Sequence, residues 1–415
     1  MNQVGADLAA AGGGDGWSLL DGAAECWFSA RSHTAGAELI SGFAQLEWPG
    51  PEPEFDLRAT GIRVRIPYGG SGPDPKLAAT ISELARRAAL CPEPAGVQRI
   101  GIGFESPEPA AVTGFWRLVG GYGTEGVDLV DPLHRDPVLR FARTEGHRPL
   151  RNRIHLDVDA GRPFGPDRLT ELERAGGHLV REAISADADG NEACIPFRSP
   201  ARLDDTAELA DWRQLMGAMV RYVTRSPAQA AELAAAVAAI ADGPGRPLII
   251  DVRPGSVIID SGKDQQEDEN FGLDAGFREA AAAVQAAARA LGLVAEQTGL
   301  RHLQVAIDAA DIPAVQRFWL AALEYRVDPR SFVTDIVDPR RRGPVVWFQQ
   351  LEGEDEARRA QRNRIRLRLA VPQDRTQARL DAALASGGVI IDDTDAPAQW
   401  RIADPEGNEL ELVAG

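Results

Sequence analysis

Apolar residues alternate with polar ones in some segments and recur every three to four positions in others, a pattern typical of mixed strands and helices. Strands are predicted at 62–66, 100–104, 152–156, 248–251, 257–260, 302–307 and 363–367. Helices are predicted at 37–43, 77–90, 106–116, 166–175, 228–241, 275–291 and 311–319. The order of these elements predicts an α+β fold built from small repeated layers.

Two short motifs occur once in each half of the chain, in the same order. The first is Asn-Arg-Ile-x-Leu, at 152–156 and 363–367. The second is Asp-x-x-Gly-Asn-Glu, at 187–192 and 404–409, and it predicts a tight turn leading into a strand, because Gly and Asn tolerate turn geometry. Two ordered motifs shared by both halves indicate an internal duplication.

The duplication and the element order divide the chain into five segments. We predict a disordered lead at 1–16, small α+β modules at 17–96 and 199–298, and larger modules at 97–198 and 299–415. Each larger module fits a βαβββ unit read twice, and each smaller one fits helices packed on a few strands.

Charge and composition exclude several classes of function. The net charge of −17 over 415 residues argues against a nucleic-acid partner, because phosphate binding needs a basic face. The N-terminal residues lack the features of a signal peptide, and no apolar run is long enough to span a bilayer. Cys26, Cys91 and Cys194 are too far apart in sequence to indicate a disulfide framework. We therefore expect a cytoplasmic protein with no membrane partner.

The larger modules resemble the glyoxalase-like members of the vicinal oxygen chelate superfamily. The resemblance rests on the Asn152-Arg153-Ile154-His155-Leu156 strand and on the Asp404-Pro405-Glu406-Gly407-Asn408-Glu409 turn with its earlier copy. It implies two domains of paired βαβββ motifs that curl around a cleft, which in the superfamily often holds a divalent metal.

The smaller modules resemble pterin-4a-carbinolamine dehydratases more weakly. Where that family carries His-His-Pro, this chain has Glu47-Trp48-Pro49. At the family's spacing, Phe55, Arg65 and Asp74 fall at its aromatic, third-histidine and Asp positions. Residues 199–300 contain no histidine. Because the proton-transferring groups are missing, we expect these modules to pack or to shape a ligand site, without dehydratase activity.

The family's metal positions are incompletely filled in each domain. The resemblance places Arg99, His155 and Cys194 at these positions in the first domain, and His302, Arg366 and Glu411 in the second. An arginine cannot ligate a cation, because its guanidinium stays protonated. If the clefts form between motifs of different halves, His302 would join His155 and Cys194 in a three-ligand site, and Arg99, Arg366 and Glu411 would form an ion-pair cluster. We expect no cofactor, with a divalent metal at the crossed site as the alternative.

Three functions remain open on these residues. The first is a small-molecule enzyme of the lyase, isomerase or cyclase type, in which His155 is the general acid or base because its ordinary pKa lies near neutrality. Trp347, Arg99 and Arg366 would then bind the ligand. The second is a small-molecule sequestration protein of the bleomycin-resistance type, and the third is a non-catalytic scaffold. We expect a monomer or a homodimer.

The other four histidines carry no motif. They fall in predicted loops or at predicted helix ends, which favours surface positions: His33, His134, His147 and His178.

Overall fold

The computed structural model has a mixed α+β architecture with three β-sheets. It describes residues 16–68, 72, 74–146, 148–161, 166–196, 201–203, 206–243, 247–266, 275–351 and 356–415, so the predicted lead and His147 lie outside the described part. The chain divides into two compact units. Unit 1 comprises Met1–Gln98, Ala201–Thr298 and Gly415, and unit 2 comprises Arg99–Pro200 and Gly299–Ala414.

Unit 1 is built on one sheet, here sheet 1, that is continuous across both halves of the chain. Its strands follow the order β1 (Ser18–Leu20), β2 (Ala23–Ser29), β4 (Gly61–Pro67), β3 (Glu54–Arg58), β17 (Ile249–Arg253), β18 (Ser256–Asp260), β16 (Ala218–Val223), β15 (Arg213–Gln214) and β14 (Ala201–Arg202). Two further strands flank this path, β5 (Cys91–Pro92) beside β2 and β19 (Val294–Ala295) beside β16.

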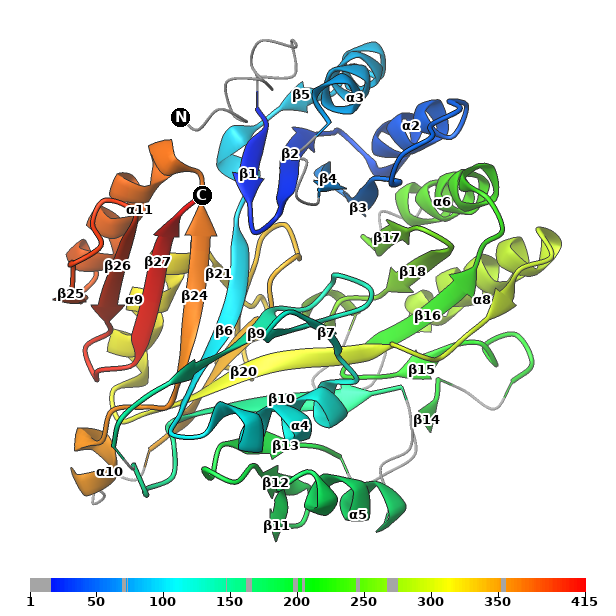
Figure 1. Cartoon of the computed structure of the whole chain (residues 1–415). Coiled ribbons are helices and arrows are strands. Elements are labelled where there is room, and N and C mark those ends of the chain that lie inside the picture. The colour runs from blue at the N-terminus through cyan, green and yellow to red at the C-terminus, as the bar shows by residue number, and fades with distance from the viewer. Residues whose placement is uncertain are drawn as a thin grey trace. The chain divides into compact units, whose positions relative to one another are not determined.

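Helices pack on one face of sheet 1 (Figure 1). They are α2 (His33–Phe43), α3 (Pro75–Arg87), α6 (Pro227–Asp242) and α8 (Ala275–Ala290); the unit also contains α7 (Lys263–Gln266) and the short 3₁₀ helix η2 (Pro94–Gly96). Ser32 and Ser226 cap α2 and α6, each accepting a hydrogen bond from a backbone N–H of the first turn. The element orders α2-β3-β4-α3 and α6-β17-β18-α8 therefore repeat within this unit.

The two halves of unit 1 meet where β3 pairs with β17. Asp56 and Asp251 lie directly opposite each other in this antiparallel pair. Like charges in that position repel, and each is neutralised by an arginine from the opposite strand: Arg253 contacts Asp56 at 2.7 Å and Arg58 contacts Asp251 at 2.7 Å. Burial would raise the pKa of Asp56, but its arginine neighbours hold this pKa well below the usual range. Reciprocal ion pairs thus join the halves.

Unit 2 contains two eight-stranded sheets. Sheet 2 has the order β11 (His178–Arg181), β12 (Ile184–Ala186), β13 (Glu192–Cys194), β10 (Ile154–Ala160), β20 (Arg301–Ala309), β23 (Val345–Gln350), β22 (Ile336–Val337) and β21 (Arg326–Val327). Sheet 3 has the order β25 (Val389–Asp392), β26 (Gln399–Ala403), β27 (Glu409–Ala414), β24 (Ile365–Val371), β6 (Arg99–Ser106), β9 (Val138–Arg143), β8 (Asp128–Val130) and β7 (Gly123–Glu125).

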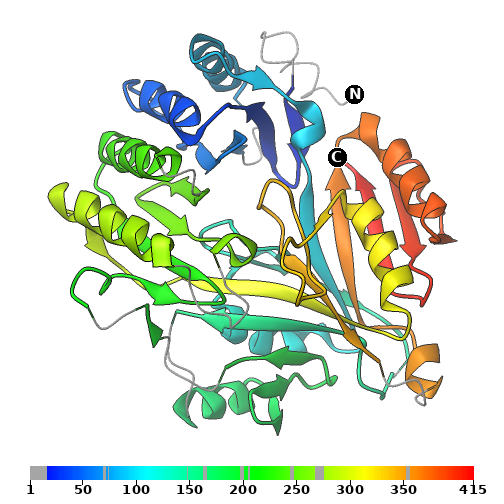
Figure 2. The same cartoon turned by 180° about the vertical axis from the view of Figure 1, so that it is seen from behind.

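Each sheet of unit 2 combines strands from both halves of the chain. In sheet 2, β10 of the first half pairs antiparallel with β20 of the second. In sheet 3, β6 of the first half pairs antiparallel with β24 of the second, and both views show these strands side by side (Figures 1 and 2). The motifs are therefore crossed between the halves, which was the arrangement left open by the sequence.

Alternate residues of these strands enter one hydrophobic core with the helices. The helices of unit 2 are α4 (Pro109–Gly120), α5 (Pro166–Arg174), α9 (Ile312–Leu323), α10 (Glu356–Ala360) and α11 (Gln373–Ala385). Phe104, Ile154, Leu156 and Ile365 are fully buried in this core. Because side chains alternate along a strand, the residues between them face the opposite side of each sheet.

The first aspartate of the repeated turn accepts hydrogen bonds from the turn itself and from a core tryptophan. In the first copy, Asp187 accepts hydrogen bonds from the backbone N–H of Asn191 at 2.9 Å and from the indole N–H of Trp116 at 2.8 Å. In the second copy, Asp404 accepts the same bonds from Asn408 and Trp319, at 2.9 and 3.0 Å. The motif therefore ties a turn to the core tryptophan of a helix, in both halves alike.

Hydrogen bonds between the two Asn-Arg-Ile motifs join the two copies. The Asn152 side-chain oxygen accepts from the backbone N–H of Arg364 at 2.9 Å, and Asn363 accepts from that of Arg153 at 2.9 Å. Both asparagines are nearly fully buried. The motifs that reveal the duplication thus stabilise the fold, and each carries one residue of the candidate site at its variable position, His155 or Arg366.

Two expectations from the sequence need correction. Strands β1 and β2 lie in a segment, 18–29, for which no strand was predicted. His33 is 1% exposed and not a surface residue: its Nδ1 lies 3.0 Å from Asp242 and its Nε2 lies 2.9 Å from the carbonyl of Leu248. Within the described residues, no helix combines the length and apolar character needed to cross a membrane.

Candidate functional site

Two polar faces in unit 2 hold the residues that the sequence singled out. The His155 face is the side of sheet 2 turned away from the hydrophobic core, and it carries His155, Asp157, Gln304, Trp347 and Cys194. The arginine face is the corresponding side of sheet 3, and it carries Arg140, Arg366, Arg368, Arg401 and Glu411. Strand alternation sets both faces, because the residues between them are buried core positions.

Asp157 is the centre of the His155 face. One of its carboxylate oxygens, Oδ2, accepts hydrogen bonds from the Gln304 amide at 2.8 Å and from the Trp347 indole N–H at 2.8 Å. The other, Oδ1, lies 3.5 Å from Nε2 of His155. The His155 and Trp347 rings meet edge to face, with centroids 6.1 Å apart. Residues from β10, β20 and β23 thus orient one carboxylate toward one imidazole.

The His155 ring lies beside a carboxylate and forms no hydrogen bond among the described residues. Its side chain is 7% exposed, and Nδ1 is buried with no hydrogen-bond partner among the described residues. Nε2 lies 3.5 Å from Oδ1 of Asp157 without forming a hydrogen bond, and Oδ1 is also buried without a hydrogen-bond partner among these residues. A carboxylate beside Nε2 favours the tautomer that carries the proton there, which leaves a lone pair on Nδ1. A neutral imidazole in this state can accept a proton, and Asp157 can stabilise the imidazolium that results.

The register separates His302 from the other two residues proposed for a metal site, since Cys194 lies opposite Asp157, two residues from His155. His155 lies opposite Ala306, whereas His302 lies opposite Asp159, four residues further along β10. At about 3.4 Å per residue this offset is roughly 14 Å, too far for two ligands of one ion. Burial raises the pKa of Cys194 to about 11, so without a metal this side chain is a thiol at neutral pH. The described residues contain no cluster of three metal-ligating side chains.

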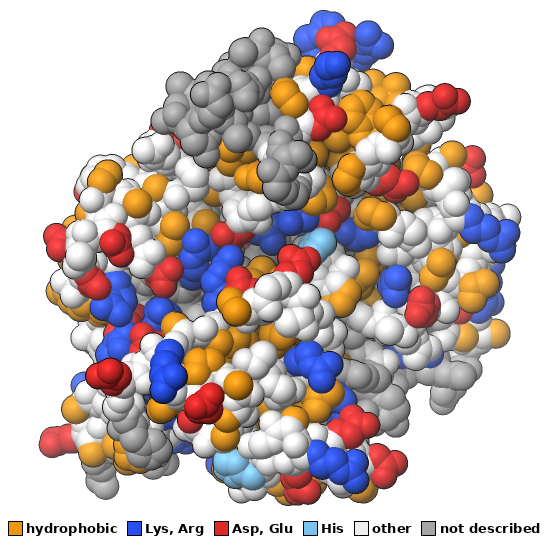
Figure 3. Space-filling view, in the orientation of Figure 1, with side chains coloured by type: hydrophobic (Ala, Val, Ile, Leu, Met, Phe, Trp, Pro, Cys, Tyr) orange, Lys and Arg blue, Asp and Glu red, His pale blue; other side chains and the backbone are white. Residues whose placement is uncertain are grey.

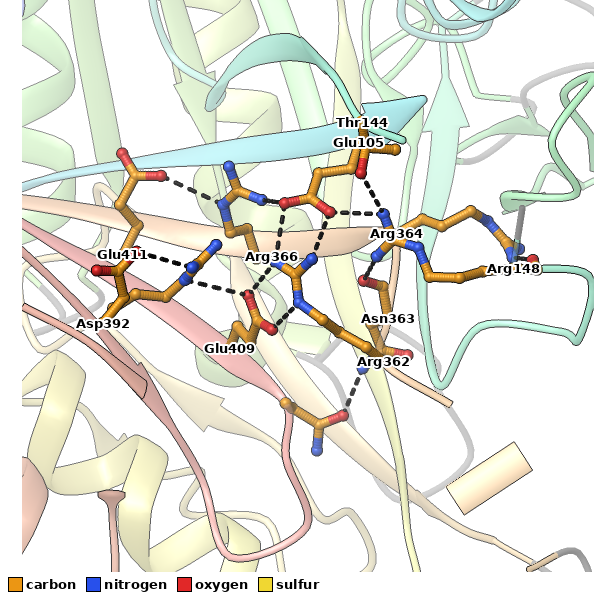
Figure 4. A network of polar contacts seen from close by, with 12 residues as sticks. Glu105, Thr144, Arg148, Arg362, Asn363, Arg364, Arg366, Asp392, Glu409 and Glu411 are labelled. Atoms are coloured by element: carbon orange, nitrogen blue, oxygen red, sulfur yellow. Dashed lines mark hydrogen bonds and ion pairs between the residues drawn. The ribbon is translucent and has the colours of Figure 1, made fainter. Parts of the chain in front are cut away.

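The arginine face is a network of ion pairs (Figure 4). Glu411 lies 3.2 Å from Nε of Arg366 and 3.1 Å from Nε of Arg368. Glu105 contacts Arg366, Arg148 and Arg362 together. Burial would raise the pKa of Glu105, but hydrogen bonds from Arg362 and Arg148 and the charge of Arg366 lower it to about 2. Each of these carboxylates therefore serves more than one arginine.

Arg99, predicted to join this cluster, occupies a different place. It lies opposite Ala370, four residues along β24 from Arg366. The cluster instead includes Arg368, which follows Arg366 by two residues on the same face. Sequence reasoning also missed Asp157 and Gln304. Alternation from His155 would have found Asp157, and alternation from Arg366 would have found Arg368.

The positions proposed for a dehydratase in unit 1 have structural roles. Arg65 forms a buried ion pair with Glu54 at 2.9 Å. Asp74 caps α3 by accepting from the backbone N–H groups of its first turn. Phe55 is buried and lines a pocket of about 110 Å³ together with Phe43 and other largely apolar residues. The dehydratase resemblance stays a prediction.

Comparison with known proteins fits the fold of unit 2. Residues 101–196 and 304–413 each match the model of the glyoxalase-like domain. Among solved structures, a glyoxalase I mutant from Zea mays is similar at 10% identity and a TM-score of 0.40, covering 76% of this chain and 94% of that one. The cppA protein from Streptococcus pneumoniae is similar at 8% identity and a TM-score of 0.29, covering 76% and 97%. No curated protein matches.

Unit 2 is thus an assembly of crossed βαβββ motifs with two opposed polar faces. More particularly, two of its segments match the model of the glyoxalase-like domain, a resemblance that the paired motifs predicted.

Proposed function

We propose that the His155 face binds a small organic molecule and that His155 acts on it as a general base, in a lyase- or isomerase-type reaction. One observation carries this proposal: a buried imidazole has Nε2 at 3.5 Å from a carboxylate oxygen, and neither that oxygen nor the other ring nitrogen, Nδ1, has a hydrogen-bond partner among the described residues. A buried polar atom without a partner costs stability, and active sites are where proteins retain such groups.

The reaction follows from the geometry of the pair. Nδ1 of His155 takes a proton from the substrate, at a carbon made acidic by an adjacent carbonyl. Asp157 stabilises the imidazolium, because its Oδ1 lies 3.5 Å from Nε2 and its Oδ2 is fixed by two donors. The proton then returns to a different carbon in an isomerisation, or to a leaving group in an elimination. Each proton transfer in this scheme uses only His155, Asp157 and the substrate.

Access to Nδ1 requires side-chain movement. The atom is shielded from water in this structure, and Trp347 contacts the imidazole edge to face. Trp347 is half-buried and comes from β23. A substrate therefore reaches the imidazole when residues around it, Trp347 first among them, change rotamer.

Proton abstraction can be tested without knowing the final product. The full chain is incubated in D₂O with a panel of small ketones and aldehydes, and loss of the α-proton signals is followed by NMR. We expect exchange with at least one compound, its abolition in His155→Gln, and its retention in His178→Gln, which changes an exposed histidine. Absence of exchange across the panel, or exchange that survives His155→Gln, would overturn the proposal.

A sequestration role is the second candidate, and the Trp347 indole favours it. A half-buried aromatic ring held by a hydrogen bond offers a rigid apolar surface for a ligand with no chemistry. Under this alternative, a compound raises the melting temperature equally in the parent protein and in His155→Gln, whereas Trp347→Ala abolishes the effect. Under the enzymatic proposal, the same compound also loses its α-proton in the parent protein.

A further inference from the structure

The two equivalent helices of unit 1, α2 and α6, differ in their first residue. Ser32 caps α2 and Ser226 caps α6, and each side chain accepts a hydrogen bond from the backbone N–H three residues later. The residue that follows the cap is His33 in α2 and Pro227 in α6. The repeat therefore places an imidazole at this position in one half and a proline ring in the other.

The His33 ring fills the space between α2 and the second half of unit 1. Helices α2 and α6 lie side by side (Figures 1 and 2). Nδ1 of His33 lies 3.0 Å from Asp242 at the end of α6, and Nε2 lies 2.9 Å from the carbonyl oxygen of Leu248 just before β17. The packing beside the ring is tight, because a Cβ on Gly36 of α2 would clash with Leu57.

The place equivalent to that of the imidazole is a cavity beside Pro227. Asp56 and Asp251 are counterparts, because they lie opposite each other where β3 pairs with β17. The residue three positions before Asp56 is Pro53, which is therefore the counterpart of Leu248. Pro227 and Pro53 both line a cavity of about 110 Å³, here called the Pro227 cavity. A close contact in one half is thus replaced by open space in the other.

The walls of the Pro227 cavity are mainly apolar. Val252 lines it where the other half has the larger Leu57. Buried side chains of α2 and β3 form a further part of the wall: Ile40, Phe43 and Phe55. An apolar protein cavity of about 150 Å³ holds a benzene ring, so the Pro227 cavity suits a single five-membered ring.

The polar part of the lining favours a ligand that donates a hydrogen bond. Pro53 and Pro227 have no backbone N–H, so their main-chain groups can only accept. The Glu52 carboxylate, which is half-buried, is a further acceptor, whereas Arg225 is exposed and its guanidinium is solvated. In the space-filling view, hydrophobic side chains lie among acidic and basic ones on the side of the molecule that carries α2 and α6 (Figure 3).

We propose that the Pro227 cavity binds a small aromatic ring with an N–H donor, of the imidazole type, in the place that the His33 ring takes in the other half. The ring packs against the aromatic walls, and its N–H is donated to an acceptor of the lining, as the His33 ring faces the carbonyl of Leu248. The cavity belongs to unit 1 and the His155 face to unit 2, so this proposal does not depend on the proposed proton transfer.

Ligand-observed NMR of the full chain at about pH 8.5 tests this site with two probes, imidazole and thiazole, a ring of the same size without an N–H. We expect saturable binding of imidazole with a Kd of about 1 mM, and binding of thiazole about tenfold weaker. Pro227→His should abolish imidazole binding, because the new side chain takes the place that His33 takes in the other half. Ala230→Leu should also abolish it, by filling the cavity from α6.

The matched control is Pro75→His, because Pro75 also begins a capped helix, α3, but lies outside the cavity lining. This variant should bind imidazole as the parent protein does. Melting temperatures equal to or above that of the parent protein show that the variants are folded. Absence of saturable imidazole binding in the parent protein would overturn the proposal. So would equal affinity for thiazole, or imidazole binding that survives in folded Pro227→His or Ala230→Leu.

Discussion

The two polar faces of unit 2 occupy equivalent positions of a duplicated fold but carry different functional groups. His155 corresponds to Arg366 and Asp157 to Arg368, since both pairs follow the Asn-Arg-Ile motif. Trp347 corresponds to Arg140, because each lies beside the equivalent residue of the neighbouring parallel strand. One face is thus a hydrogen-bonded acid–base pair, and the other is a cluster of guanidinium groups.

The two faces differ in the side chains that they carry, whereas the strands and turns that support them are alike in both halves. Gln304, which fixes Asp157, has Gly101 as its counterpart, and the missing side chain is what gives Arg140 its place. The hydrogen bonds accepted by Asp187 and Asp404 are alike in partners and distances. A duplicated fold can therefore change the chemistry of one face by exchanging side chains on three strands, with the core left intact.

Removing the aspartate of the repeated turn should lower the free energy of unfolding more than the other substitutions, and by the same amount in both halves. Asp404→Ala leaves the Trp319 indole N–H and the Asn408 backbone N–H without their buried acceptor. We expect a loss of about 3 kcal/mol in the free energy of unfolding, and a similar loss for Asp187→Ala. Urea denaturation measures both. If the free energy of unfolding falls by less than about 1 kcal/mol in only one of the two variants, the two turns are not equivalent.

The arginine face should make stability depend on acid pH. The pKa of Glu105 in the folded protein is about 2, below its ordinary value of 4.5, so folding favours the ionised carboxylate. Its contribution is therefore fully present above about pH 4.5 and is lost as the pH falls toward 2. Glu105→Gln should cost about 2 kcal/mol at pH 7 and progressively less in acid. A pH-independent difference would contradict this account.

Removing one donor on the His155 face should have a smaller effect. Trp347→Phe keeps an aromatic ring but deletes the hydrogen bond to Asp157, which Gln304 still contacts. We expect a loss of about 1 kcal/mol. Trp48→Phe changes a partly buried indole of unit 1 that packs against the core, and it should cost less. If both variants lose the same free energy, the bond to Asp157 contributes little.

Adding a methyl group at Gly101 should have the smallest effect on stability. Gly101→Ala places a methyl group against the flexible end of Arg140, which can shift. The free energy of unfolding should change by less than about 0.5 kcal/mol. A large destabilisation would mean that the Arg140 position is rigidly fixed by the core.

Much of the fold was predictable because the determinants are local. The turn motif and the alternating strands directly indicate βαβββ units, and the core tryptophans, Trp116 and Trp319, lie where helical spacing puts them. The crossed pairing of β10 with β20 and of β6 with β24 could only be left open, since a strand pattern carries no information about its partner.

The site was less predictable because its contacts are long-range. His155 was found from its motif. Its neighbour Asp157 is oriented by hydrogen bonds from Gln304 and Trp347, which lie 147 and 190 positions away from Asp157 in the sequence. The separation of His302 from His155 follows from strand register, which the sequence does not specify. His33 appeared to be a surface residue because its partner, Asp242, lies 209 positions away.

The position of the ring proton on His155 tests the central claim most directly. In protein labelled with ¹⁵N-histidine, the two ring nitrogens of neutral His155 can be distinguished by NMR at alkaline pH, with His155→Gln to assign the signal. We predict that the proton resides on Nε2, beside Asp157, and that Nδ1 is unprotonated. A proton on Nδ1 would place the lone pair against the carboxylate and would contradict the proposed general base.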